Sequence, residues 1–521
     1  MLRIVVSTVA LVFGASLASP LASPASAQSA ADLVKQAVAA QGGADALKKL
    51  QTISIKGEAK FWEPGQSFKP GGEPRFLGDA IYSATGDFAN HTVRIEWDRD
   101  QKYPAPEKMK YTETFAQGVG YVTDDKGSKP MSGIRLAAQT REIVRSSPTL
   151  MLYALEHPAD VTSAGIQKLD GRSLPAIALK VGQYNYTVLF DRKTKLPAAV
   201  RSKDDDNIAG DSNFDLVMSD WKAVNGVQMA HTKSGRVNGV EVVRHTEKEV
   251  SANAPILASL GTVPDEIKAK AVKGPPNGTN VPYQWVLRRI YLTRLLDSDS
   301  VIVPDGGSLK LVELAPNVQH VQGGSADNLI VAMKDHLVIF DAPYGEQQSR
   351  WVIDAAKAKY PGKRIKFLVL THHHMDHTGG MRTYVAEGAT VVVPQGSRAV
   401  FAKDARAPHT VTPDAQQKAG NKAAKIVEVK DTMAMKDDTM EIKLMNIPNP
   451  HVDGMIIAHV VGPNIVYVTD LISPRGPIGR NPATVSVGDA LRKANISDST
   501  IVGGHGTTAK QADIAQALAA N

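Results

Sequence analysis

The stretch THHHMDHTGG, residues 371–380, places four histidines and one aspartate within ten positions. Neither an exposed surface nor an apolar core favours adjacent titratable rings, whereas imidazole is the commonest protein ligand for metals. The stretch begins where KRIKFLVLT, residues 363–371, ends, and that segment has the composition of a buried strand. Because active sites in α/β folds gather at the carboxyl ends of strands, the sequence predicts a metal-binding loop here.

The spacing within this loop indicates that it serves two metal ions. If the chain stays extended, His372, His374 and Asp376 project to one side of it. We expect His377 to be swung round as the chain turns through residues 378–380 into the next helix. We assign no metal to His373, which lies between two of these residues and is expected to point the other way.

Three further candidate ligands each follow an apolar segment in the second half of the chain. His451 follows EIKLMNI, Asp470 ends IVYVTD, and His505 lies among glycines after another short apolar run. A lone histidine is more often structural, but this ordered set behind successive strands favours a metal site. The chain has no cysteine, which excludes thiolate ligands.

Taken together, H-x-H-x-D-H at residues 372–377 followed by His451, Asp470 and His505 resembles the metallo-β-lactamase superfamily over about residues 308–521. The resemblance implies an α/β fold in which two mixed β-sheets lie between helices, with the metals at one edge. It also implies that one metal is held by His372, His374 and His451. The other would be held by Asp376, His377 and His505, with Asp470 bridging the two.

The resemblance also indicates which branch of the family is nearest. Asp341 in LVIFDAP resembles the family's structural aspartate, which supports the metal-binding loop from behind the ligands. All seven ligands are present, as in the glyoxalase II and lactonase type, and His374 replaces the carboxylate expected of the di-iron branch. An imidazole-rich site suits two zinc ions best, with iron and manganese as the alternatives.

This ligand set predicts a hydrolase. Two metals roughly 3.5–4 Å apart share a water and lower its pKa to about 7, so that a bridging hydroxide attacks a carbonyl. Asp376 and His377 are the predicted catalytic residues, Asp376 orienting the hydroxide and moving a proton to the leaving group. The expected substrate is an ester, lactone, thioester or β-lactam. A mononuclear iron sulfur dioxygenase and a non-catalytic periplasmic binding protein are the alternative interpretations.

Candidate substrate-binding residues lie in two loops. SPRGPIGRNPATVSVG, residues 473–488, carries Arg475 and Arg480, which are placed to hold a substrate carboxylate or, equally, to be solvated on an exposed loop. Tyr344 follows the segment that ends in Asp341 and is expected to line the other rim of the site.

Residues 28–262 predict a mainly antiparallel β domain. TISIKGEAKF, residues 52–61, alternates apolar and polar side chains, and Asp-Gly or Asn-Gly pairs at 170–171, 225–226 and 238–239 are typical of hairpin turns. The domain is faintly similar to the curved sheets that carry lipids or lipoproteins in the bacterial periplasm, and a purely structural role is the alternative. Residues 263–307, which contain the Pro/Gly-rich KGPPNGTNVP, form the predicted connector to a domain at 308–521.

The first 27 residues are typical of a signal peptide. Arg3 is their only charge, an apolar run follows from Ile4 to Leu21, and Ala25-Ser26-Ala27 forms a small-x-small cleavage site. We therefore expect cleavage after Ala27 and a periplasmic or secreted protein with no transmembrane anchor. The net charge of +7 is scattered, which favours a small-molecule substrate over nucleic acid and leaves the oligomeric state open.

Overall fold

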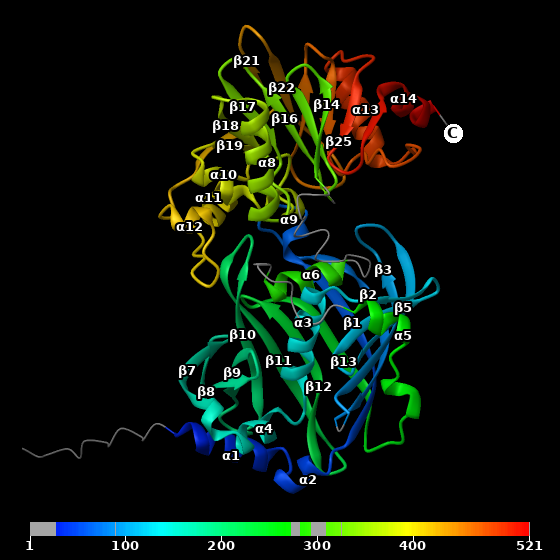
Figure 1. The fold of residues 1–521 in the computed structure, drawn as a ribbon. Helices are drawn as coiled ribbons and strands as arrows, with labels where there is room; N and C mark the ends of the chain where they lie inside the picture. Colours follow the sequence, from blue (N-terminus) through cyan, green and yellow to red (C-terminus); the bar gives the residue numbers. More distant parts are fainter. Residues whose placement is uncertain (1–27, 89, 272–281, 293–308, 325, 520–521) are drawn as a thin grey trace, which may run out of the picture.

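The computed structural model describes residues 28–519 except 89, 272–281, 293–308 and 325. The predicted signal peptide and its cleavage site thus lie outside the described residues. The chain folds into an antiparallel β domain and a layered α/β domain, drawn below and above in Figure 1. Among the described helices, none is both long and apolar enough to cross a membrane.

The N-terminal domain is built on one sheet of thirteen strands in the order β6-β5-β4-β3-β2-β1-β13-β12-β11-β10-β9-β8-β7. Neighbours are antiparallel, and β1 pairs with β13, so the first and last strands of the domain meet in its middle. The bounds are β1 (Thr52–Glu63), β2 (Arg75–Asp87), β3 (Thr92–Gln101), β4 (Glu107–Ala116), β5 (Val119–Asp124), β6 (Gly127–Pro130), β7 (Val161–Leu169), β8 (Arg172–Val181), β9 (Tyr184–Phe190), β10 (Pro197–Asp206), β11 (Gly210–Val224), β12 (Val227–Val237) and β13 (Val240–Ala252).

The predicted hairpins are confirmed. The turns β7–β8, β11–β12 and β12–β13 fall at the predicted Asp-Gly and Asn-Gly pairs, and Asp170, Asn225 and Asn238 have φ of 49°, 48° and 51°. Two-residue hairpin turns need positive φ, which these residue types tolerate.

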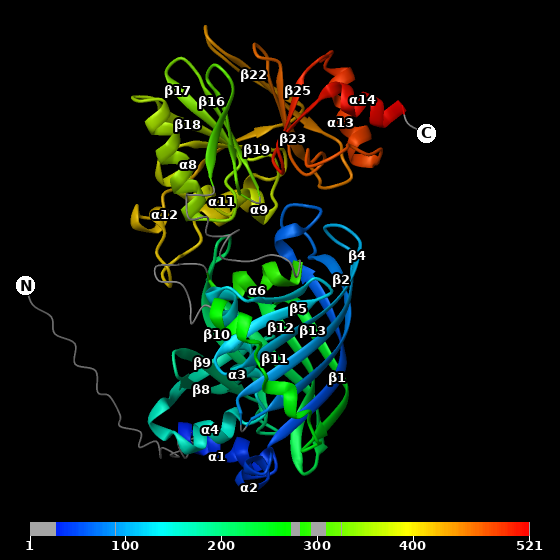
Figure 2. The ribbon, with the colours of Figure 1, turned by 45° about the vertical axis from the view of Figure 1, so that its right-hand side comes forward.

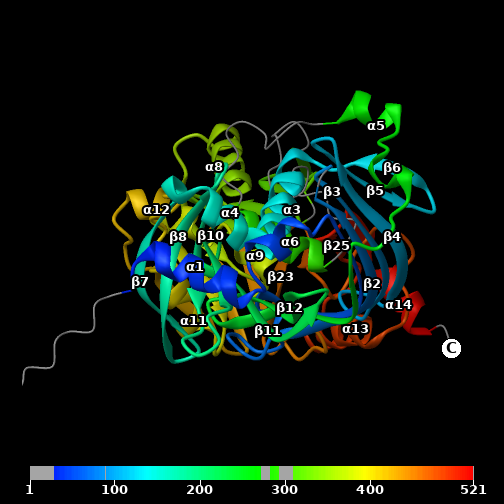
Figure 3. The same ribbon diagram turned by 90° about the horizontal axis from the view of Figure 1, so that it is seen from below.

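Helices lie at the ends and within the curve of this sheet, as the view from below shows (Figure 3). The helices α3 and α6 both contribute to the core that covers β1 and β2, so part of the predicted connector forms a helix that packs against this domain. The bounds are α1 (Ala30–Ala40), α2 (Ala44–Lys48), η1 (Pro64–Gln66), α3 (Gly133–Ser146), α4 (Leu150–Glu156), η2 (Pro158–Asp160), η3 (Ala258–Gly261), α5 (Asp265–Lys270) and α6 (Tyr283–Leu292).

The C-terminal domain contains a seven-stranded and a six-stranded mixed sheet. The first sheet has β14 (Lys310–Ala315), β15 (Val318–Gln322), β16 (Asn328–Ala332), β17 (His336–Phe340), β18 (Arg364–Val369), β19 (Thr390–Pro394) and β20 (Lys425–Val429). The second has β21 (Thr432–Lys436), β22 (Glu441–Ile447), β23 (Met455–Val460), β24 (Ile465–Val468), β25 (Thr500–Gly503) and β26 (Thr508–Lys510).

Three apolar layers hold this domain together, and they confirm the predicted α/β sandwich. One core lies between the two sheets, a second joins the first sheet to α8, α10 and α11, and a third joins the second sheet to α13 and α14. The helices are α8 (Glu346–Lys359), α9 (Met375–Thr378), α10 (Met381–Ala386), α11 (Arg398–Ala405), α12 (Ala415–Lys418), α13 (Pro482–Lys493) and α14 (Gln511–Ala519). Strands β17, β18 and β19 are parallel, so their carboxyl ends open on one edge.

Candidate metal centre

The histidine-rich loop follows β18 and bends earlier than the sequence predicts. His374 has extended dihedrals, φ −65° and ψ 146°, and caps α9, which begins at Met375. The expectation that the chain stays extended through Asp376 is therefore wrong: Asp376 and His377 lie in the first turn of a helix. In a helix consecutive side chains point about 100° apart, so the two still diverge.

Two glycines after this helix allow the loop to approach the rest of the domain. A Cβ on Gly379 would lie 2.2 Å from the Tyr344 carbonyl oxygen, and a Cβ on Gly380 would lie 1.9 Å from the Ser349 hydroxyl oxygen. Any other residue would push the loop outward, so the glycines fix the position of the histidines before them.

The structure brings all seven predicted ligands together at this edge. Their side-chain atoms form two groups, each with its members within 4.8 Å of one another: His372, His374, His451 and Asp470 in the first, and Asp376, His377 and His505 in the second. The residues come from four separate segments that follow β18, β22, β24 and β25.

Asp470 lies between the two groups. Its Oδ2 is 3.0 Å from His372 Nε2 and 2.9 Å from His451 Nε2. Its Oδ1 is 2.7 Å from His505 Nε2 and 3.1 Å from His377 Nε2. One carboxylate oxygen therefore faces each group, as a bridging ligand requires.

The chemistry of the donors fits a pair of divalent metals. Five imidazoles and two carboxylates, with no thiolate, form a donor set that zinc accepts. Burial lowers the pKa of His372 to about 4 and that of His374 well below its usual value, so both rings are neutral and keep a lone pair for a metal. Burial alone would raise the pKa of Asp470, but His377, His505 and His451 outweigh it and hold that pKa well below its usual value.

Asp341 supports the loop from behind, as the sequence predicts for its position. Its Oδ2 lies 2.9 Å from His377 Nδ1, on the side of the ring opposite the cluster. The backbone nitrogen and hydroxyl of Thr371 donate to its Oδ1 at 2.8 and 2.9 Å. A carboxylate in this place fixes the orientation of the imidazole and makes its other nitrogen more basic.

The N-terminal domain also reaches the cluster, which sequence reasoning missed. The carbonyl oxygen of Ser67 lies 3.1 Å from His374 Nε2, leaving Nδ1 to face His451. The same carbonyl lies 2.9 Å from Nε2 of His373, which therefore points toward the other domain. Burial lowers the pKa of His373 to about 3.

A second contact from the N-terminal domain involves Gln66, at the end of η1. Its Nε2 donates to Asp376 Oδ1 at 2.6 Å, and its Oε1 accepts from the Tyr103 hydroxyl at 2.6 Å. The Tyr103 ring stacks on His451, with centroids 6.3 Å apart, and Arg75 donates to the His451 carbonyl at 2.8 Å. Gln66 and Asp376 are 310 positions apart, and no local motif marks either end of such a contact.

The candidate substrate-binding residues lie in different surroundings. Tyr344 is only 1% exposed, and its hydroxyl accepts from Arg289 of α6 at 3.2 Å, so its side chain is buried between the domains. Arg475 is exposed and packs against Gly506, next to His505. Arg480 donates to the Leu518 carbonyl in α14.

Arg289 is a further cation near the cluster that the sequence did not single out. It is 4% exposed, and its Nε and Nη1 have no hydrogen-bond partner among the described residues. Burial raises the pKa of Asp376, but His377 and, to a smaller extent, Arg289 act against it and the net pKa is lowered. Arg289 therefore brings positive charge to the Asp376 side of the site.

Comparison with known proteins finds similarity in this part of the chain. The family described as Metallo-beta-lactamase superfamily matches residues 323–505. Similar solved structures include a metallo-beta-lactamase from Pontibacter korlensis, 14% identical over 40% of this chain and 97% of the other, with a TM-score of 0.32. A metallo-beta-lactamase from Hirschia baltica is 18% identical over 40% and 95%, also with a TM-score of 0.32.

A third similar structure is a sec-alkylsulfatase from Pseudomonas sp., 18% identical over 40% of this chain and 41% of the other, with a TM-score of 0.31. No curated protein matches the chain. The similarity to the metallo-beta-lactamase superfamily thus covers residues 323–505, the part of the chain that carries all seven candidate ligands.

Proposed function

We propose that this protein is a hydrolase that uses two zinc ions to cleave an ester, lactone, thioester or β-lactam. The observation that carries the proposal is the position of Asp470, whose two carboxylate oxygens each face one of the two groups of candidate ligands. A single-metal site would need only one of these groups.

The metals would be held by the seven residues already named, His372, His374 and His451 on one side, Asp376, His377 and His505 on the other, and Asp470 between them. When bound, the pair would supply a nucleophile by lowering the pKa of water and would polarise the carbonyl under attack.

The chain's own residues would orient the ligands and the attacking water and would move protons around this centre. Gln66 holds one oxygen of Asp376, which leaves the other to direct a water and to pass its proton to the leaving group. Asp341 keeps His377 in one orientation throughout. These positions are fixed before substrate arrives, which is the condition for efficient electrostatic catalysis.

Cations at the edge of the cluster of candidate ligands would bind the substrate. Arg475 next to the His505 loop and Arg289 on the Asp376 side are both placed to attract a substrate carboxylate. Tyr344 would act by positioning Arg289 through its hydroxyl. Arg480 would contribute only if its loop moved away from α14. We also propose that the protein acts in the periplasm or outside the cell.

The first test is the metal content of the purified mature protein, measured by plasma mass spectrometry, together with hydrolysis of lactone, thioester and β-lactam panels. We expect two zinc ions per chain and turnover of at least one class. In D470N, which removes a charge but preserves shape, we expect loss of metal and loss of turnover.

The matched control is H459Q, which alters a buried histidine bonded to Asn464 outside the cluster and should retain both metals. One iron per chain with oxygen-dependent activity would support a sulfur dioxygenase instead. A folded protein that binds no metal would overturn the proposal and favour a binding protein.

A further inference from the structure

The N-terminal domain contains a cavity of about 830 Å³ between the concave face of its sheet and α3. This volume lies within the range of about 300–1,000 Å³ that is typical of small-molecule sites. Both Leu136 and Ser146 of α3 line it, so it extends about 15 Å along that helix at 1.5 Å per residue. Ile290 and Tyr291 of α6 also line it. This helix lies on the side of the N-terminal domain nearest the C-terminal domain (Figure 2).

The wall of this cavity is mainly apolar and aromatic. Val93, Ile95 and Trp97 alternate along β3 on the concave face, and all three are only half-buried although they lie inside the domain. Tyr82 and Tyr111 from the neighbouring strands complete this side. Large apolar side chains that remain partly accessible within a domain indicate a binding site rather than a packed core.

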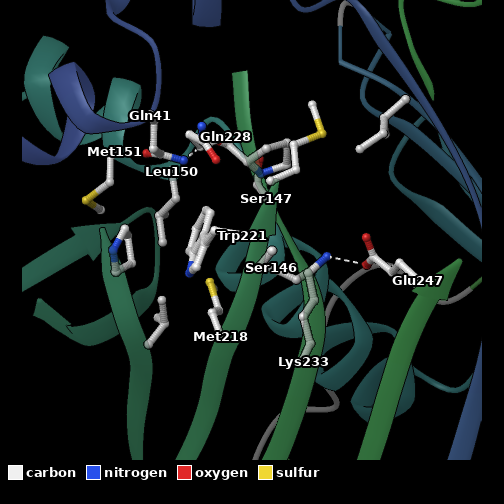
Figure 4. A pocket seen from close by; sticks show the side chains of 16 residues that line it. Gln41, Ser146, Ser147, Leu150, Met151, Met218, Trp221, Gln228, Lys233 and Glu247 are labelled. Carbon is white, nitrogen blue, oxygen red and sulfur yellow. Dashed lines mark hydrogen bonds and ion pairs between the residues drawn. The ribbon is translucent and has the colours of Figure 1, made fainter. Parts of the chain in front are cut away.

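The acidic groups within the cavity are held by partners. Glu113 accepts from Trp97 and Arg135, Glu142 accepts from Arg145, and Glu247 accepts from Lys233. The Lys233–Glu247 pair lies where the cavity adjoins the small pocket in Figure 4, because both residues line both hollows. Asp87, which also lines the cavity, accepts from Asn90. The cations Arg145 and Lys233 of the lining therefore each have an acidic partner.

Arg99 is different. It is 2% exposed, and no ion pair to it occurs among the described residues. Its Nη1 donates to the Ile290 carbonyl at 3.2 Å and its guanidinium lies 4.8 Å from the centre of the Phe61 ring. Its Nε and Nη2 have no acceptor at hydrogen-bond geometry within the part of the chain that the structure describes, and the nearby Tyr111 hydroxyl is a neutral group that supports the charge without balancing it. A buried cation without an anion is costly, so this position favours an anionic ligand.

We propose that the cavity binds one fatty acid or a similar single-chain anionic amphiphile. The hydrocarbon chain lies along β1–β4, against Trp97 and Ile95, and the carboxylate pairs with Arg99 at the end nearest α6. The apolar wall and the buried Arg99 match the hydrocarbon and the anionic head group of such a molecule. This site is distinct from the metal centre, and its occupation needs no metal.

The test is isothermal titration calorimetry of the delipidated full-length mature protein with dodecanoate, tetradecanoate and hexadecanoate, and with the matching alcohols. We expect one site per chain and a dissociation constant that falls about fourfold for each added methylene. The acids should bind about tenfold or more tightly than the alcohols, because a hydrogen-bonded charge contributes more than a neutral hydroxyl.

Two variants locate the ligand. R99L should abolish the preference for acid over alcohol, whereas R94L, on the outer face of the same strand, should retain it. A84W should weaken acids and alcohols alike by filling the cavity. The proposal is overturned if the wild type binds none of these ligands saturably or binds both head groups equally. It is also overturned if neither R99L nor A84W changes the binding of these ligands. Because none of these readings depends on turnover, they remain interpretable if the hydrolase proposal fails.

Discussion

Gln66 is a side chain of the N-terminal domain that hydrogen-bonds directly to the side chain of a predicted metal ligand. It is 2% exposed, with its amide nitrogen on Asp376 and its amide oxygen on Tyr103. Because an ionised carboxylate only accepts, Asp376 requires the amide nitrogen to face it, and the Tyr103 hydroxyl holds the other end of the amide. A residue of this kind acts through the ligand that it orients.

We expect Q66L to lower metal affinity or kcat/KM by about 10- to 100-fold, the usual effect of losing a partner behind a ligand. Zinc affinity measured by competition with a chromophoric chelator would give the first value and steady-state kinetics the second. Q319L, at a buried glutamine of β15 that bonds to Glu313 and Tyr360 away from the site, should change neither. Equal losses in both variants would indicate a general effect on folding.

His245 is a second residue with a measurable consequence. It lies in the wall of the apolar cavity, against Tyr82 and Trp97, where burial and then the charge of Lys233 lower its pKa to about 4. The unfolded chain keeps the ordinary value near 6.5. Between these two values the unfolded state binds more protons, so the folded state loses stability as the pH falls.

We expect the wild type to lose at most about 3 kcal/mol through this group between pH 6.5 and 4, from 1.36 kcal/mol per pKa unit. H245Q should not show this pH-dependent loss of stability. The difference in unfolding free energy between the two proteins should therefore change between pH 6.5 and 4. Urea titrations at several pH values would measure it. A difference that stays constant with pH would contradict the assignment.

At the scale of elements, α6 holds η1 in place. Arg288 of α6 forms buried ion pairs with Glu63, which precedes η1, and with Asp206 at the end of β10. Glu63 also accepts from the Gly65 backbone nitrogen at 2.7 Å, so the same carboxylate caps η1. Gln66 ends that short helix, and the packing of α6 is therefore transmitted to the metal centre.

We expect R288M to destabilise the protein by about 3–5 kcal/mol, because it leaves two buried carboxylates without their cation. Adding E63Q and D206N should recover most of this loss, since the triple variant buries no unpaired charge. Chemical denaturation would measure both. If the single and triple variants were equally unstable, the packing of Arg288 rather than its charge would be responsible.

At the scale of the whole molecule, the two domains are joined by a shared apolar core and by polar contacts. Tyr344 and Met375 of the C-terminal domain belong to the same apolar core as α6 and β1. Thr410 donates to Asp211 at 2.7 Å through its backbone nitrogen, and His409 lies 2.9 Å from Asp205. The metal ligands nevertheless all lie in the C-terminal domain, so metal should act first on that domain's stability.

We expect removal of the metals to lower the unfolding temperature of the C-terminal domain. A ligand present at a thousand times its dissociation constant stabilises the folded state by about 4 kcal/mol. Four of the five tryptophans, at positions 62, 97, 221 and 285, lie before the C-terminal domain. On metal removal, the unfolding midpoint followed by tryptophan emission should therefore fall less than the calorimetric midpoint of the C-terminal domain. Readdition of zinc should reverse the change, and a calorimetric trace unaffected by chelation would contradict a structural role for the metals.

Local features of the sequence predicted the local features of the structure. Asn-Gly and Asp-Gly fix hairpin turns because few other residues accept positive φ. The apolar side chains of residues 365–370 and 441–447 are mostly buried, as the pattern of these segments predicts. The sequence also predicted the positions of the cluster at 372–377 and of His451, Asp470 and His505, because each segment follows its own strand. The start of α9 was not, since the extended and helical forms of a short segment differ little in propensity.

Only the tertiary structure decided what surrounds these elements. The contacts of Gln66 and Ser67 with the metal-binding loop span more than 300 positions, and each end is an ordinary polar residue of a loop. Arg99 is likewise one arginine among many until the curve of the sheet and α6 bury it without an anion. The sequence by itself determined the candidate metal ligands and the strands that carry them. The partners that orient those ligands and the cavity in the other domain depend on how distant surfaces pack, which no local pattern encodes.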